Sequence, residues 1–157
     1  MRPILTRMIP WLWLLLAGSA ATAGPLPAKP DPALSPAAVV QLQLAALARV
    51  DQPQRDAGLA VVFGFASPGN RKLTGPLKRF ATMIREGYPE MLNHRGTTLA
   101  PLVMQGDVAL QGVELIDRSG VLHRYVFQLS KQPDGEFRDC WMTDSVYQAP
   151  DTPEQAT

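Results

Sequence analysis

The chain has 157 residues, with 15 Lys and Arg against 14 Asp and Glu, and 46% of its residues are hydrophobic. This length fits about one domain, and a net charge of +1 supplies no overall field that would attract nucleic acid or an acidic membrane. A single cysteine excludes an intramolecular disulfide and a thiolate zinc cage.

The first 23 residues have the three zones of a secretory signal peptide. Arg2 and Arg7 form the positive start, residues 11–17 form a short apolar run, and Ala21-Thr22-Ala23 is a cleavage site before Gly24. The run is shorter than the roughly 20 residues of a membrane-spanning helix, although an uncleaved anchor is the alternative. The lipidation cysteine and the twin arginines of other export signals are absent from this segment. We therefore expect export by the general secretory route, to a periplasm or the exterior, with no stable membrane anchor after cleavage.

Two segments flank the predicted folded part. Residues 24–35 contain four prolines, which favour extended backbone, and we interpret them as a tether. Residues 149–157 combine prolines with small and acidic residues, which is typical of a flexible tail. Residues 36–148 are then the single domain.

Three helices are predicted in the first half of this domain. Ser35-Pro36 is a helix start, with a hydroxyl cap before a proline, and the helix should reach residue 49. A second helix follows Asp56 and stops at Pro68-Gly69. A third begins after residues 74–76 and ends at Gly87, a typical C-terminal cap. Apolar residues recur at i, i+3, i+4 and i+7 in the second and third helices.

After residue 89 the hydrophobic period falls towards two, which indicates strands near 98–105, 108–118, 121–131 and 136–147. Turn residues separate them at 106–107, 119–120 and 133–135. Helices followed by hairpin-linked strands predict an α+β domain in which helices cover one face of a four-stranded antiparallel sheet. A nucleotide-binding α/β fold is disfavoured because the glycine-rich phosphate loops are absent from the sequence.

Several sequence blocks resemble one family. They include Phe65-Ala66-Ser67-Pro68, Thr74-Gly75-Pro76-Leu77, Met91-Leu92-Asn93-His94 and Cys140-Trp141-Met142-Thr143-Asp144. These blocks resemble the domain-of-unknown-function family 4864, in its versions from photosynthetic bacteria and plant plastids, over about residues 36–147. The arrangement is also similar to the cone-shaped nuclear-transport-factor-2-like architecture, which hosts ketosteroid isomerases and dehydratases. The first resemblance implies no known activity, and fold analogy does not transfer function.

The candidate catalytic residues are His123, Tyr125 and Asp144. Strand alternation places His123 on the same face as Tyr125, and a base on this face needs an acid and a substrate within hydrogen-bond reach. The alternative for His123 is a hydrogen-bonded wall residue. Alternation in the last strand puts Thr143 and Ser145 on one side and Asp144 on the other. Asp144 is then a pocket acid, a partner of a helix-borne arginine or a solvated strand-end residue.

The candidate ligand-binding residues are Cys140, His94 and Phe127. Cys140 is a buried small hydrophobe, a ligand-facing or redox-sensitive thiol, or a nucleophile paired with a histidine. His94 precedes the first strand, where it lies at a pocket rim or serves a turn or cap. Phe127 shares the aromatic face of Tyr125. Two histidines 29 positions apart and one cysteine lack metal-ligand spacing, so we expect neither a metal nor a cofactor.

Basic residues gather between positions 71 and 95. The predicted surface patch consists of Arg71, Lys72, Lys78, Arg79 and Arg85. It is either a stripe for an anionic partner or a solvated helix face.

These observations favour an exported, non-catalytic domain that binds a small apolar or amphipathic ligand or mediates association, including a homodimer through the exposed sheet face. The export signal disfavours nucleic acid as a partner. The competing hypothesis is a pocket enzyme, an isomerase, dehydratase or hydrolase that uses His123, Tyr125 and Asp144.

Overall fold

The computed structural model describes residues 29–149. The predicted signal peptide 1–23, residues 24–28 of the predicted tether and residues 150–157 of the predicted tail lie outside this range. The described end of the tether forms a turn, in which the backbone carbonyl of Asp31 accepts the Leu34 N–H at 3.0 Å. Leu34 packs against the core, so the folded part begins slightly before the first helix.

Between residue 29 and the sheet there are four helices, where three were predicted: α1 (Pro36–Leu47), α2 (Ala57–Phe65), α3 (Pro68–Thr74) and α4 (Leu77–Gly87). The additional helix is α3. Ser67 caps it by accepting the Asn70 N–H at 3.2 Å, as Ser35 caps α1. Pro68 was interpreted only as a stop, but proline at a first helical position costs no hydrogen bond, so Pro68 also begins the next helix.

The described residues form a sheet of five antiparallel strands, where four were predicted: β1 (Gly96–Leu99), β2 (Val103–Gln105), β3 (Val108–Ile116), β4 (Leu122–Lys131) and β5 (Trp141–Gln148). The strand order is β1-β3-β4-β5, and β2 also pairs with β3. The predicted strand 98–105 is two strands because Pro101 between them cannot donate to a ladder. The last strand starts later than predicted, since Gly135–Phe137 form a 3-10 turn.

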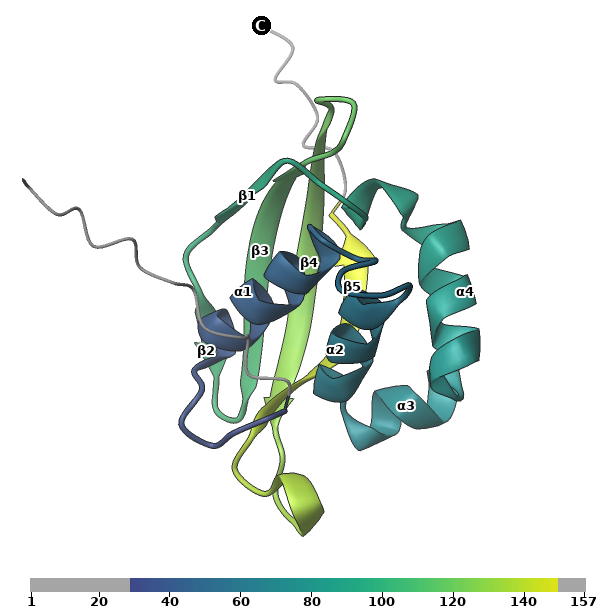
Figure 1. Ribbon diagram of the computed structural model, residues 1–157. Helices are drawn as coiled ribbons and strands as arrows, with labels where there is room; N and C mark the ends of the chain where they lie inside the picture. Colours follow the sequence, from purple (N-terminus) through teal and green to yellow (C-terminus); the bar gives the residue numbers. More distant parts are fainter. Residues whose placement is uncertain (1–28, 150–157) are drawn as a thin grey trace, which may run out of the picture.

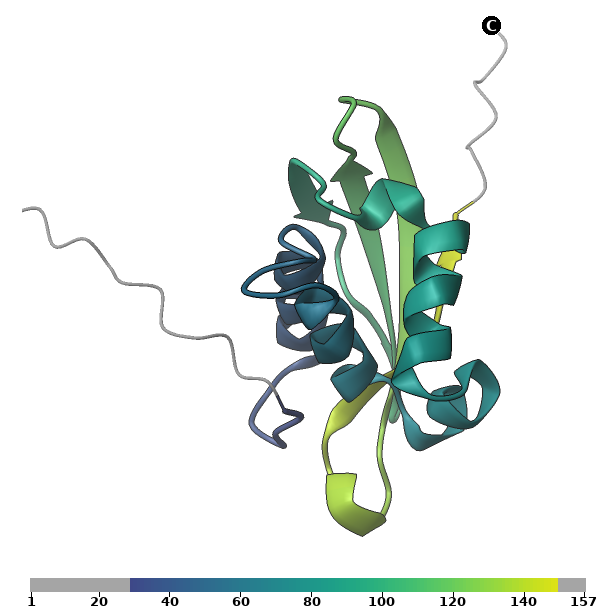
Figure 2. The same cartoon turned by 45° about the vertical axis from the view of Figure 1, so that its right-hand side comes forward.

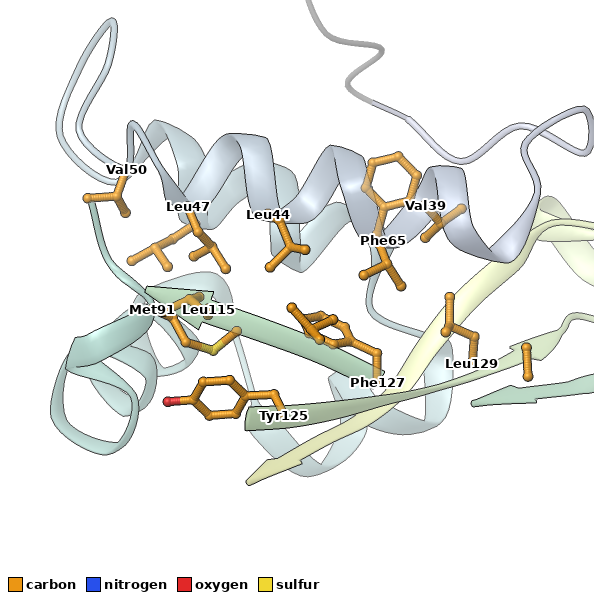
Figure 3. Close-up of a cluster of buried hydrophobic side chains, with 14 of the residues drawn as sticks. Val39, Leu44, Leu47, Val50, Phe65, Met91, Leu115, Tyr125, Phe127 and Leu129 are labelled. Carbon is orange, nitrogen blue, oxygen red and sulfur yellow. The ribbon is translucent and has the colours of Figure 1, made fainter. Parts of the chain in front are cut away.

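The four helices lie on one face of the sheet, with α1 crossing it and α4 running beside β5 (Figures 1 and 2). Tyr125, Phe127 and Leu129 extend from β4 towards these helices and are at most 2% exposed, which confirms the predicted alternation in this strand. Figure 3 shows them opposite the apolar side chains of α1, including Leu44 and Leu47. The main core therefore lies between the helices and the sheet.

Helices α1 and α2 approach each other at Gly58. Its N–H donates to the Val50 carbonyl at 2.8 Å, and a Cβ here would lie against the Ala46 carbonyl oxygen and 2.8 Å from the Val50 Cα. Only glycine fits this contact without moving backbone. Among residues 29–149, no helix has both the length and the apolar character needed to cross a membrane.

Candidate functional site

A cleft of about 270 Å³ lies between α2, α3 and α4 on one side and strand β5 on the other. Strand β5 is the last strand in the sheet order, so its outer edge faces the cleft. Most of the wall is apolar, with contributions from Leu47, Val62, Phe80, Ile84, Met91 and Val146. Leu73 and Met83 also line the cleft and are 80% and 37% exposed, so apolar side chains extend to its mouth.

Polar groups on one wall centre on Thr143. Its hydroxyl accepts from Gln43 Nε2 at 2.8 Å and lies 3.2 Å from Gln43 Oε1, to which it can donate. Its backbone carbonyl accepts from the Ser67 N–H at 2.8 Å and from Asn70 Nδ2 at 3.1 Å. Gln43 and Thr143 are 1% and 3% exposed, so these two side chains satisfy each other where water is largely excluded.

A β-bulge changes which residues of β5 reach the cleft. Leu129 pairs with Thr143, whereas the preceding Gln128 pairs with Ser145, so Asp144 is an extra residue in the strand. The predicted alternation is therefore wrong beyond Thr143. Because of the bulge, Thr143 and Val146 pair with core-facing residues of β4, and all four residues 143–146 line the cleft.

Asp144 is the one charged side chain among the cleft-lining residues. It is partly exposed, and within the described part of the chain it makes no hydrogen bond or ion pair. The predicted partner on a helix, an arginine, is therefore not found among these residues. The location and partial exposure of Asp144 are compatible both with the pocket-acid alternative and with the solvated strand-end alternative.

His123 lies at the other end of β4, in the β3–β4 hairpin. Its Nε2 is 2.9 Å from Asp117 Oδ2, and Asp117 Oδ1 accepts the N–H groups of Ser119 and Val121. The hydrogen bond from His123, followed by that from Val121, lowers the pKa of Asp117 to about 2. This pair therefore closes the hairpin turn.

Tyr125 is 2% exposed, and its ring lies 6.3 Å from that of Tyr88. Burial, followed by the nearby carboxylate of Glu90, raises the pKa of Tyr125 to about 12. Asp144 lies opposite residues 128–129 of β4, which are five or six positions from His123. At the usual rise per strand residue, this separates Asp144 from His123 by roughly 17 to 20 Å. The structure thus does not bring the three candidate catalytic residues together.

The three candidate ligand-binding residues occupy different places. Phe127 lines the cleft. Cys140 is 3% exposed and outside the cleft lining, and burial raises the pKa of its thiol, which agrees with the small-hydrophobe alternative. His94 Nε2 lies 2.8 Å from the Leu44 carbonyl in the last turn of α1, which agrees with the capping alternative.

Two of the five residues of the predicted basic patch are bound within the fold. Arg85 forms ion pairs with Asp51 and Asp56, which hold the loop between α1 and α2. Arg71 donates to the carbonyls of Gly64 and Ala66, and its guanidinium lies over aromatic rings. Among described residues, ion pairs are not found for the other three, which are Lys72, Lys78 and Arg79.

No group of three or more His, Cys, Asp or Glu side chains with metal-binding geometry occurs between residues 29 and 149. Gln43 and Asn70 also line the cleft, although neither was predicted from the sequence as a site residue. Gln43 had a detectable signal, because it is a polar residue at helical spacing between Val39 and Leu47, both on the apolar face. Asn70 had no such signal, since its helix was not predicted.

The structure thus defines an α+β domain with helices on one face of an antiparallel sheet and a cleft beside the sheet edge. A family model described as a domain of unknown function (DUF4864) matches residues 32–156, and the chain belongs to this family. The match confirms the family resemblance found in the sequence. No curated protein and no solved structure matches the chain.

Proposed function

We propose that this chain is a non-catalytic binding domain that holds a small apolar or amphipathic molecule in the cleft beside β5. The observation that supports this most strongly is the continuous apolar lining of the cleft, which ends at a polar wall. Ligand sites are typically concave and apolar, with a few polar groups that orient the ligand. Exposed Leu73 and Met83 at the mouth agree with this function, because large exposed apolar side chains often mark binding sites.

We also propose a nuclear-transport-factor-2-like cone for the fold and export for the location. The helices on one sheet face, with a cleft between helices and sheet, are compatible with such a cone. Export is supported by the signal-peptide pattern. Protein recovered from the exported compartment should begin at Gly24 on N-terminal sequencing, and an intact Met1 would contradict cleavage.

Native mass spectrometry of protein purified from its own compartment tests the binding function. We expect extra mass that is lost on denaturation. The double variant Leu73→Trp and Met83→Trp narrows the mouth from α3 and α4 and should reduce this retained mass. The matched control is Val103→Trp and Met104→Trp on β2, where both residues are similarly exposed but outside the cleft lining.

If the mouth variant and the control variant retain the extra mass equally, this result would contradict the cleft as the binding site. A wild-type protein without retained mass, which also binds no apolar probe in solution, would contradict the binding function itself.

Self-association through the outer sheet face is the second candidate function. The strand register places four exposed side chains on the face opposite the helices, namely Val103, Ile116, Leu122 and Tyr147. A second copy could cover them in a symmetric dimer. Light scattering should show a dimer that Leu122→Lys with Tyr147→Lys converts to a monomer, and a wild-type monomer at high concentration would contradict this proposal.

A further inference from the structure

We propose that the ligand of the cleft is a small cation with an apolar body, a primary ammonium compound, whose head group binds Asp144. This inference rests on the proposed binding function and specifies its ligand class. This class is favoured by the size of the cleft, by its one charged residue, by its aromatic rings and by the hydrogen bonds that its polar groups already make.

The charge of the lining favours a cation. Asp144 lines the cleft, and no Lys, Arg or His does so among the residues that the structure describes. Asp144 makes no ion pair with any residue that the structure describes. The head group of an ammonium ligand would therefore not compete with a lysine or arginine for this carboxylate. Charge-assisted hydrogen bonds of this type are stronger than neutral ones. A carboxylate or phosphate ligand would instead meet a like charge.

Three side chains on the wall already donate hydrogen bonds within the protein. Asn70 Nδ2 donates to the Thr143 carbonyl, the Thr74 hydroxyl donates to the Asn70 carbonyl, and the Tyr88 hydroxyl donates to the Val146 carbonyl. The side-chain oxygens of Asn70, Thr74 and Tyr88 remain able to accept hydrogen bonds. The polar wall is therefore rich in acceptors, which match the three N–H donors of a primary ammonium group.

Aromatic rings supply a further attraction for a cation. Phe80, Tyr88 and Phe127 come from three different segments and all line the cleft. The face of an aromatic ring attracts an ammonium group. The same rings also provide the surface for an apolar body.

The volume limits the size of the ligand. A cleft of about 270 Å³ lies at the small end of the roughly 300 to 1,000 Å³ that is typical of small-molecule sites. A site of this size favours a compact ligand.

Three probes of similar size separate the head groups: 2-phenylethylamine, 2-phenylethanol and 3-phenylpropanoate. Isothermal titration calorimetry on the mature protein should rank them amine, alcohol, carboxylate, with the amine about tenfold tighter than the alcohol. Asp144→Asn should reduce amine affinity to the level of the alcohol and leave alcohol affinity within about twofold. The matched control is Asp107→Asn, which removes the same charge from an exposed turn outside the cleft lining and should change neither affinity.

The alternative outcomes each have a distinct meaning. Equal binding of amine and alcohol, or tighter binding of the carboxylate, would overturn the ammonium inference while the binding function stands. Equal losses of amine affinity in Asp144→Asn and Asp107→Asn would overturn it as well, because the effect would then be one of net charge. Binding of none of the three probes would overturn the inference, and the retained-mass experiment would then decide the binding function independently.

Discussion

Replacing Thr143 by valine is the sharpest test of the polar wall of the cleft. The hydroxyl of Thr143 is the hydrogen-bond partner of Gln43 Oε1 among the described residues and one of two acceptors for Gln43 Nε2. Valine keeps the shape of the side chain but leaves the amide oxygen buried without a donor. Such a loss costs about 1 to 3 kcal/mol.

The expected effect can be measured as a lower unfolding temperature. At about 4 °C per kcal/mol for a domain of this size, the midpoint of Thr143→Val should fall by roughly 4 to 12 °C. Gln43→Leu should cause a similar loss, because it leaves the hydroxyl of Thr143 without its partner. The double variant should be close to the wild type, since both polar groups are removed together.

Differential scanning calorimetry on the wild type, the two single variants and the double variant forms a double-mutant cycle. A coupling energy of about 2 kcal/mol or more is expected. Additive losses, or a Thr143→Val midpoint within about 1 °C of the wild type, would refute the reasoning. Either result would mean that water from the cleft already hydrates the Gln43 amide.

Three further predictions concern the scaffold. Gly58→Ala should lower the free energy of unfolding by about 3 kcal/mol or more in urea titrations, because its Cβ meets backbone. Gly69→Ala in α3, where a Cβ would make only an ordinary contact with Ser67 Oγ at 3.9 Å, should instead be neutral or raise it by up to about 1 kcal/mol. A matching loss at both sites would contradict the close approach at Gly58. The pKa of Asp117 is lowered to about 2 in the fold, so the stabilising effect of its carboxylate is complete above its ordinary range near 4 and is lost as pH falls towards 2. Asp117→Asn should therefore lose less stability than the wild type between pH 5 and pH 2. Parallel plots of unfolding free energy against pH for the two proteins would be inconsistent with this role. Arg85→Gln removes ion pairs to two aspartates and should lower the thermal midpoint by a few degrees at most, with a smaller effect in high salt. Arg79→Gln changes an exposed residue that makes no ion pair among described residues, and it should leave the midpoint unchanged.

Local sequence signals located most of the helices and the central hairpin. Ser35-Pro36 and Gly87 correctly mark the start of α1 and the end of α4, because helix caps depend on neighbouring residues alone. Strands β3 and β4 were predicted within two residues at each end, since alternation and the turn between them are also local. Pro68 shows the limit of such signals, because one proline can end one helix and begin the next.

The candidate site was less predictable, because it depends on contacts between distant parts of the chain. Phe127 was identified from alternation, and Asp144 was proposed as a pocket acid, but the bulge that places residues 143–146 along the cleft has no local signal. It arises where Ala66, after α2, forms a bridge to Thr143. The separation of His123 from Asp144 likewise follows from strand register, which residue types do not reveal.

The outer edge of β5 also bears on how the protein avoids polymerising. An exposed strand edge is a template for another strand, and proteins commonly block it. Here the carbonyls of Thr143 and Val146 are already occupied by donors from Ser67, Asn70 and Tyr88. At the opposite edge of the sheet β3 is covered by two short strands, of four and three residues. Aggregation by strand addition would therefore first require α3 and the segment after α4 to detach from β5, so weakening this attachment should promote fibrils before it unfolds the core.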